Sequence, residues 1–294
     1  MQGKMYEEEK KNKMICTSIL DKKGETPHFW GRMKEVQKED IIFHYVRGEI
    51  VAISTTTSDC YEDFIPYQTD EVGYIVKTNY LELERPIVVK NYFDEIKSLQ
   101  PVKYAAFQEN GDGNQGYLYP CNEMLAFKLL EIISNLNIYL DTEEQLELAI
   151  GSVIKKERNE LGVLLSTAIH ETHSKIRRTE RKYEQALQQK WNHQCAICQL
   201  DLPELLKATY SKPWKDCTKE EKLDPMNGLL LCANHEILYT SGFIAFDGTG
   251  KIHIASELAP EQYEKLAIAP NLKVHREENH KPYYKWHKKH IFRN

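Results

Sequence analysis

Two pairs of potential metal ligands constrain the fold of this chain more than any other feature of its sequence. Cys195 and Cys198 are separated by two residues, and Cys232 and His235 have the same spacing. Thiolate and imidazole are ligands that suit Zn²⁺, and two short-spaced pairs from distant segments can tie a small fold together. The alternative is a set of free cysteines in a core, since reduced cysteine is among the most buried residue types. Because both pairs have ligand spacing, we expect a structural zinc site.

Two motifs lie between the ligand pairs. The first reads Leu-Lys-Ala-Thr-Tyr-Ser-Lys-Pro-Trp at residues 206–214, and the second reads Asp-Pro-Met-Asn-Gly-Leu-Leu-Leu-Cys at residues 224–232. A short helical segment, Gly242 and a hairpin pattern around residues 247–250 follow. Together they resemble the HNH, or ββα-metal, endonuclease family. The resemblance implies cleavage of DNA phosphodiesters with a catalytic Mg²⁺ or Mn²⁺ in addition to the structural zinc.

The resemblance also assigns roles to single residues. Asn227 takes the position of the family's central asparagine, which would fix the loop between the two strands. If His235 completes the zinc site, the helix position that binds the catalytic ion falls on Glu236. The reaction needs a base that deprotonates water and a divalent ion that holds the developing negative charge.

The base position departs from the family pattern. Tyr210 stands where the family has its general-base histidine, and Thr209 occupies the neighbouring first-strand position. Tyrosine titrates near ~10, so it acts as a base at neutral pH only if a cation or hydrogen bonds favour its phenolate. A metal ion alongside could do that; the alternative is an inactive site, which Thr240 in place of a common acid also favours. If Tyr210 takes no part, His235 or His253 is the next candidate.

The first part of the chain is predicted to be mostly β-structure. Residues 40–46 and 49–54 are rich in β-branched and aromatic side chains and flank a turn at Arg47 and Gly48. Residues 73–83 and 86–89 are further strand candidates, and residues 123–133 have helical spacing. Strands followed by a helix predict a small barrel-like α+β domain.

Two stretches of this domain carry a second resemblance. Residues 29–45 read Phe-Trp-Gly-Arg-Met-Lys-Glu-Val-Gln-Lys-Glu-Asp-Ile-Ile-Phe-His-Tyr, and residues 103–118 read Lys-Tyr-Ala-Ala-Phe-Gln-Glu-Asn-Gly-Asp-Gly-Asn-Gln-Gly-Tyr-Leu. They resemble the N-terminal reader of EVE–HNH restriction endonucleases, a PUA-like fold. The resemblance implies a domain that flips a modified cytosine, such as 5-hydroxymethylcytosine, out of double-stranded DNA into an aromatic pocket.

A flipped base needs a flat apolar surface on which to stack and amide groups that read its polar edge. The aromatic candidates are Trp30, Phe43 and Tyr45. The amide candidates are Gln108, Asn110 and Asn114. Core packing is the alternative for each aromatic residue, and the glycine-rich run at residues 110–114 is also an ordinary turn signal.

Residues 142–190 have a helical pattern with apolar and basic stripes. The apolar residues are Leu146, Ile150, Val153 and Ile154, followed by Leu161, Leu164 and Leu165. They could form a homodimer surface or pack on the helix's own domain. The run at residues 175–182 and the tail at residues 281–294 are basic, and a polyanion responds to such stripes rather than to the net charge of −5. Arg181 and Lys190 are candidates for phosphate contacts.

The composition is that of an ordinary globular protein, with 41% hydrophobic and 28% charged residues among 294. No apolar run approaches a membrane span or the core of a signal peptide. Three of the seven cysteines belong to the ligand pairs and the others are scattered, which is typical of a reducing compartment. We therefore expect a cytoplasmic protein that makes no contact with membranes.

The sequence as a whole predicts an α+β protein with three parts. These are a PUA-like (EVE) β-barrel reader at residues 1–137, a helical linker at 138–185, and a zinc-bound ββα-metal HNH domain at 186–294. The expected function is modification-dependent restriction of phage DNA. One alternative is a protein that binds modified DNA but carries an inactive HNH domain. Another is a nuclease whose N-terminal domain binds a protein partner instead of a base.

Overall fold

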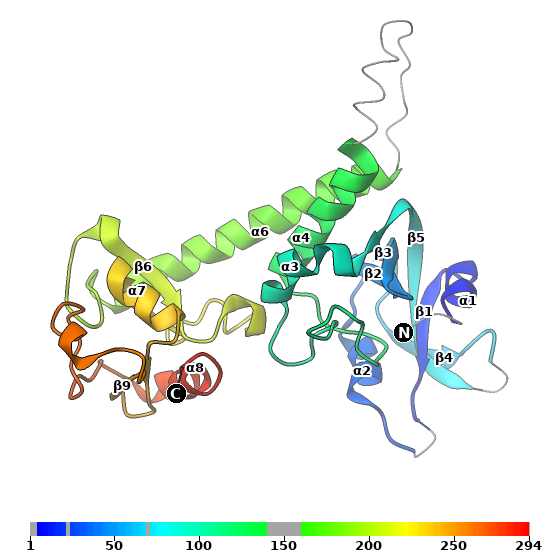
Figure 1. The fold of residues 1–294 in the computed structure, drawn as a ribbon. Coiled ribbons are helices and arrows are strands. Elements are labelled where there is room, and N and C mark those ends of the chain that lie inside the picture. The colour runs from blue at the N-terminus through cyan, green and yellow to red at the C-terminus, as the bar shows by residue number, and fades with distance from the viewer. Residues whose placement is uncertain (1–4, 22–23, 69–70, 140–159, 294) are drawn as a thin grey trace, which may run out of the picture. The chain divides into compact units, whose positions relative to one another are not determined.

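The computed structural model describes residues 5–21, 24–68, 71–139 and 160–293. The chain forms two compact units, Met1–His173 and Ser174–Asn294 (Figure 1). The border between the units falls inside one helix, α6 (Glu160–Lys190). None of the described helices combines the length and the apolar character needed to cross a lipid bilayer.

The first unit contains a curled antiparallel sheet (Figure 1). Its strands are β1 (Met14–Ser18), β2 (Ile41–Val46), β3 (Glu49–Thr56), β4 (Tyr61–Phe64) and β5 (Val72–Val88). The order is β1-β5-β3-β2, and β4 also pairs with β5. Arg47 and Gly48 join β2 to β3 with φ angles of 50° and 100°. Positive φ at both positions is what a two-residue hairpin turn requires, so the predicted turn is confirmed.

The strands differ from the predicted ones in two respects. The segments predicted at residues 73–83 and 86–89 are one continuous strand, β5, and a register shift opposite Ile50 and Ala52 of β3 accommodates its length. Strands β1 and β4 were not predicted, because both are short and β1 pairs with β5, which lies far from it in the sequence. The architecture is nevertheless the mixed α+β fold that the sequence predicts.

Helices cover the sheet of the first unit. They are α1 (Tyr6–Lys11), α2 (His28–Gly31), α3 (Phe93–Ile96) and α4 (Glu123–Ser134). The side chain of Asn122 caps α4 by accepting a hydrogen bond from the amide of Leu125 at 3.0 Å. Leu125 and Leu129 of α4 share one core with Leu161 and Leu165 of α6. The stripe around Leu161 therefore packs on its own unit, whereas the stripe at residues 146–154 lies outside the described residues.

The second unit has the ββα arrangement at its centre. Its elements are β6 (Leu206–Tyr210), β7 (Gly228–Cys232), α7 (Ala233–Thr240), β8 (Ile244–Phe246), β9 (Ile252–Ile254) and α8 (Lys281–His290). β6 and β7 are antiparallel, with Tyr210 opposite Gly228, and β7 leads directly into α7. β8 and β9 form the predicted hairpin.

The last turns of α6 belong to the core of this unit. Tyr183 and Leu187 of α6 are buried together with Leu229, Leu230 and Leu231 of β7. The hydroxyl of Tyr183 donates to the carbonyl of Asn227 at 3.0 Å, immediately before β7. A side chain at Gly228 would collide with the Tyr183 phenol, so glycine is required there.

A buried histidine joins α8 to α7. The ring of His287 stacks on that of Tyr239, with centroids 3.7 Å apart and an angle of 3°, and its Nε2 lies 3.0 Å from the Tyr239 carbonyl. Burial lowers the pKa of His287 to about 4. In the unfolded chain the same group titrates near ~6.5, so only the unfolded state binds a proton between these values.

Stability should therefore fall as the pH decreases below about 6.5. The lowered pKa of His287 predicts a loss of about 2 kcal/mol in the free energy of unfolding between about pH 7 and pH 5. The His287→Gln variant should lose this pH-dependent part of the free energy of unfolding. The control His275→Gln changes an exposed histidine and should retain it. Denaturant unfolding at both pH values measures the difference. Equal pH dependence in all three proteins would contradict the prediction.

Candidate functional site

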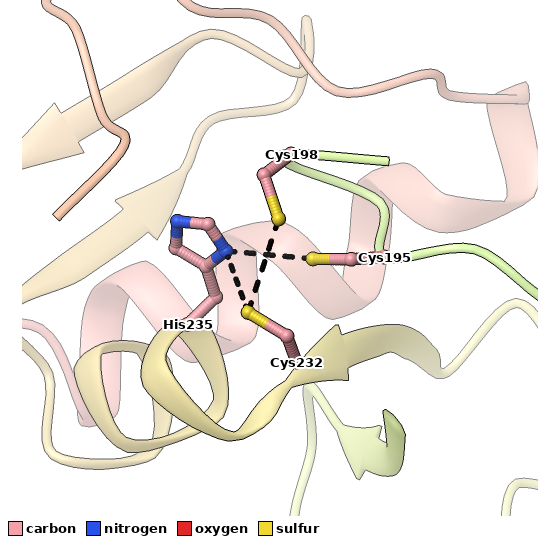
Figure 2. A group of neighbouring side chains, drawn as sticks. All are labelled: Cys195, Cys198, Cys232 and His235. Atoms are coloured by element: carbon pink, nitrogen blue, oxygen red, sulfur yellow. Dashed lines mark hydrogen bonds between the residues drawn. The ribbon is translucent and has the colours of Figure 1, made fainter. Parts of the chain in front are cut away.

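Four side chains converge between the loop that follows α6 and the start of α7 (Figure 2). Cys195 and Cys198 lie in the loop, Cys232 ends β7, and His235 lies in the first turn of α7. The Sγ atoms of Cys195 and Cys232 are 3.4 and 3.2 Å from Nδ1 of His235. The Sγ atoms of Cys198 and Cys232 are 3.9 Å apart. Ligands placed tetrahedrally at ~2.3 Å from zinc are about 3.7 Å apart, so this cluster could bind zinc.

The surroundings of the cluster favour a cation. Nε2 of His235 lies 2.9 Å from the carbonyl oxygen of Leu266 and can donate to it, which leaves the Nδ1 lone pair directed at the sulfur atoms. Burial alone would raise the pKa of Cys195, but its contact with His235 and hydrogen bonds from backbone amides lower it to about 6. Burial raises the pKa of Cys198 to about 12, so a thiolate at that position needs a cation.

Asn227 organises the loop between β6 and β7. Its side chain is fully buried. The Oδ1 atom accepts a hydrogen bond from the amide of Lys212 at 2.8 Å, and Nδ2 donates to the carbonyls of Lys212 and Glu221 at 3.1 and 3.2 Å. Nδ2 also lies 3.1 Å from Sγ of Cys217. These contacts fix the loop that follows Tyr210.

Tyr210 is packed into this loop from the end of β6. Its ring stacks on that of Tyr183, with centroids 3.8 Å apart and an angle of 8°. Its hydroxyl donates to the carbonyl of Lys222 at 2.7 Å. Burial, and then the acidic groups of Cys217 and Glu180, hold the pKa of Tyr210 well above its ordinary value. The phenolate is disfavoured in this environment, and the role of Tyr210 as a base remains a prediction.

The other positions of the expected catalytic site offer few ligands. Thr209 is 4% exposed, and its hydroxyl donates to the carbonyl of Lys207 at 3.3 Å. Glu236 is partly exposed on α7, and the exposed Thr240 donates to its carbonyl at 2.8 Å. Among the described residues, only the cysteine–histidine cluster brings three or more His, Cys, Asp or Glu ligands together. The role of Glu236 as the carboxylate ligand of a catalytic ion therefore remains a prediction.

The first unit contains a pocket of about 330 Å³. Phe43 and Tyr45 of β2, together with Phe107 and Asn114, contribute to its lining. The hydroxyl of Tyr45 accepts a hydrogen bond from the amide of Gly113 at 3.1 Å, and its ring meets that of Phe107 edge-on at 5.3 Å. Three of the six predicted base-binding residues, Phe43, Tyr45 and Asn114, thus meet in one cavity.

The other three predicted base-binding residues do not line this pocket. Trp30 lies in α2, and its ring meets that of Phe29 edge-on at 6.3 Å. Nε2 of Gln108 donates to the carbonyl of Gly113 at 3.3 Å. The side chain of Asn110 donates to Asp112 at 2.8 Å and accepts from the Asp112 amide at 3.0 Å. The side-chain amides of Gln108 and Asn110 thus stabilise the loop. This is what we expect if residues 110–114 form an ordinary turn, the alternative to a role in base binding.

Several polar residues of the pocket were not singled out in the sequence. They are Arg32, Glu35, Asp40, Tyr117 and Tyr119. Arg32, Glu35 and Asp40 lie in the stretch that resembles the EVE reader, which was the signal that could have revealed them. Tyr117 lies in the second such stretch, but nothing in the sequence indicated that its hydroxyl bonds to the buried carboxylate of Glu9, 108 positions earlier.

Comparison with known families identifies one part of the chain. Residues 195–247 match the family model described as HNH endonuclease. The match begins at the first cysteine of the cluster and extends through β6, β7, α7 and β8. This segment is therefore an HNH endonuclease domain, which suggests that the chain is a DNA endonuclease. No curated protein matches the chain.

Loss of one ligand tests the cluster. We expect one zinc ion per chain by elemental analysis, and Cys198→Ser should lose both the ion and the fold of the second unit. The reason is that structural zinc sites supply apparent binding energies of about 10–16 kcal/mol to folding. The control Cys121→Ser, which changes an exposed cysteine of the first unit, should keep the zinc and the unfolding temperature. A stable wild-type protein without zinc would contradict the assignment.

Proposed function

We propose that the protein is a modification-dependent DNA endonuclease. The first unit binds a modified cytosine, such as 5-hydroxymethylcytosine, and the HNH domain hydrolyses the DNA backbone. The observation that carries this proposal is the pocket that Phe43, Tyr45 and Asn114 share, in a chain that also contains an HNH endonuclease domain. Aromatic rings offer the stacking surface, and an amide offers hydrogen bonds, that recognition of a flipped base requires. The biological role would be restriction of phage DNA.

The HNH residues would divide the work of hydrolysis. Glu236, partly exposed on α7, would hold Mg²⁺ or Mn²⁺. A divalent ion there supplies positive charge for the scissile phosphate. Tyr210 would first lose its proton to solvent, once its hydroxyl has left the Lys222 carbonyl and a nearby cation has lowered its pKa, and the phenolate would then accept a proton from the attacking water. Asn227 would keep the loop that follows Tyr210 in place.

A second function is favoured by a specific observation. The Tyr210 ring lies against Tyr183 and its hydroxyl is engaged by Lys222, while Thr209 is buried. These contacts suit a structural residue better than a base. The second candidate is therefore a protein that binds modified DNA through the first unit without cleaving it.

The reader is tested by a pair of aromatic substitutions. Phe43→Ala should reduce the preference for 5-hydroxymethylcytosine duplexes over unmodified duplexes at least fivefold, since base stacking is worth about 1–3 kcal/mol. Trp30→Ala is the matched control, because Trp30 lies outside the pocket lining, and it should keep the preference. Fluorescence anisotropy on both duplexes measures the ratio of dissociation constants. An undiminished preference in folded Phe43→Ala would exclude this pocket.

Cleavage with Mn²⁺ separates the two functions. In the endonuclease, the rate should rise with pH, because the raised pKa of Tyr210 makes the phenolate scarce at neutral pH. Tyr210→Phe should abolish cleavage and keep DNA binding, whereas Tyr210→His should retain activity. If the wild-type protein cleaves DNA no faster than the Glu236→Gln variant does, the second function holds, and the protein binds modified DNA without cleaving it. Unchanged cleavage by Tyr210→Phe would remove Tyr210 from the mechanism.

A further inference from the structure

One face of α6 in the second unit carries a cluster of exposed cations. Arg177, Arg178, Arg181 and Lys182, here called the basic stripe, line a shallow hollow together with Ser174 and Gln185. At 100° per residue these six positions fall on one face of the helix about 140° wide. The buried residues Ile176, Tyr183 and Leu187 lie on the opposite face. The stripe therefore points away from the core of its unit.

Acidic side chains of the same helix do not neutralise the stripe. At 100° per residue, Glu180 falls outside the basic face, between this face and the one that carries the buried residues. Glu184 accepts a hydrogen bond from Gln188 at 3.4 Å. Within the described part of the chain, no ion pair involves any of the four cations of the stripe.

Lys190 differs from the stripe although it lies on the same helix. Its Nζ is 2.5 Å from a carboxylate oxygen of Glu277, and its side chain is 14% exposed. The sequence placed Lys190 beside Arg181 as a candidate phosphate contact. The structure separates them, since Lys190 joins α6 to another segment of its own unit while Arg181 stays exposed.

We infer that the basic stripe binds the phosphate backbone of double-stranded DNA, whatever its sequence or modification. The inference rests on the proposed function only in taking DNA as the partner. From residue 177 to residue 182 the helix rises ~7.5 Å, and duplex DNA presents about four phosphates over such a length of its axis. Three of the four cations are arginines, whose planar guanidinium binds phosphate through two parallel hydrogen bonds. Such contacts supply affinity and position the duplex, and the pocket supplies specificity.

The test is the salt dependence of DNA binding by the zinc-loaded full chain. The probes are two fluorescein-labelled duplexes, identical except that one contains 5-hydroxymethylcytosine. A triple variant changes the arginines, Arg177→Gln, Arg178→Gln and Arg181→Gln. Its matched control removes the same charge from exposed lysines of the same unit, Lys219→Gln, Lys265→Gln and Lys273→Gln.

Each phosphate contact contributes ~0.9 to the slope of log affinity against log salt. We expect the triple variant to lower the slope by about two to three and to weaken binding of both duplexes at least tenfold at ~0.1 M salt. The ratio between the duplexes should stay the same, because phosphate contacts carry no base information. The control variant should change the slope by less than ~1.

Three results would overturn the inference. They are an unchanged slope in the triple variant, an equal loss in the control, and altered self-association with unaltered DNA binding, which would identify a second copy of the chain as the partner. The proposed function fails separately. If the wild-type protein binds both duplexes equally, the first unit does not recognise the modified base. The inference about the basic stripe would still be tested, because the salt dependence of binding is measured on unmodified DNA as well.

Discussion

The second unit depends on four ligand atoms being held at one point. Cys195 and Cys198 precede β6, whereas Cys232 ends β7 and His235 follows it, so the cluster joins the two ends of the β6–β7 segment. Without a cation, converging thiolates would repel one another, and packing alone would have to hold the start of α7. The cluster thus sets the start of α7, and with it the position of Glu236 one residue after His235.

Hydrogen bonds and ring stacking hold the loop at the centre of the HNH domain in place. Asn227 keeps a full set of hydrogen bonds to the loop between the strands. In the same loop, Tyr210 and Tyr183 form a stacked pair, and the Tyr183 hydroxyl reaches the Asn227 carbonyl. An imidazole in the place of Tyr210 would offer a smaller ring to this stack. The tyrosine thus stabilises the loop while its environment opposes ionisation, so its packing would work against the role of a base that we propose for it.

Local patterns predicted the fold better than they predicted the pocket. Ligand spacing and the motif around Gly228 indicated the cluster and the ββα arrangement, because both depend on neighbours in sequence. From the sequence, Phe43 and Trp30 were equally good candidates for stacking on a flipped base. Only tertiary packing decides that Phe43 lines the cavity and Trp30 does not. The contact of Tyr117 with Glu9 joins residues 108 positions apart, and no periodicity reports such a pair. The strand β1 escaped notice for the same reason, since its partner is β5.

The course of α6 has a consequence for the modularity of this protein. Its first turns complete the core of the first unit through Leu161 and Leu165, and its last turns complete the HNH core through Tyr183 and Leu187. A segment cut at residue 186, the predicted start of the HNH domain, would leave the nuclease fold without the phenol that packs against Gly228. Recombination that exchanged the first unit for another domain would therefore have to join the chains inside a continuous helix and preserve its hydrophobic phase. The unit of inheritance is accordingly longer than the HNH motif and includes the helix before it.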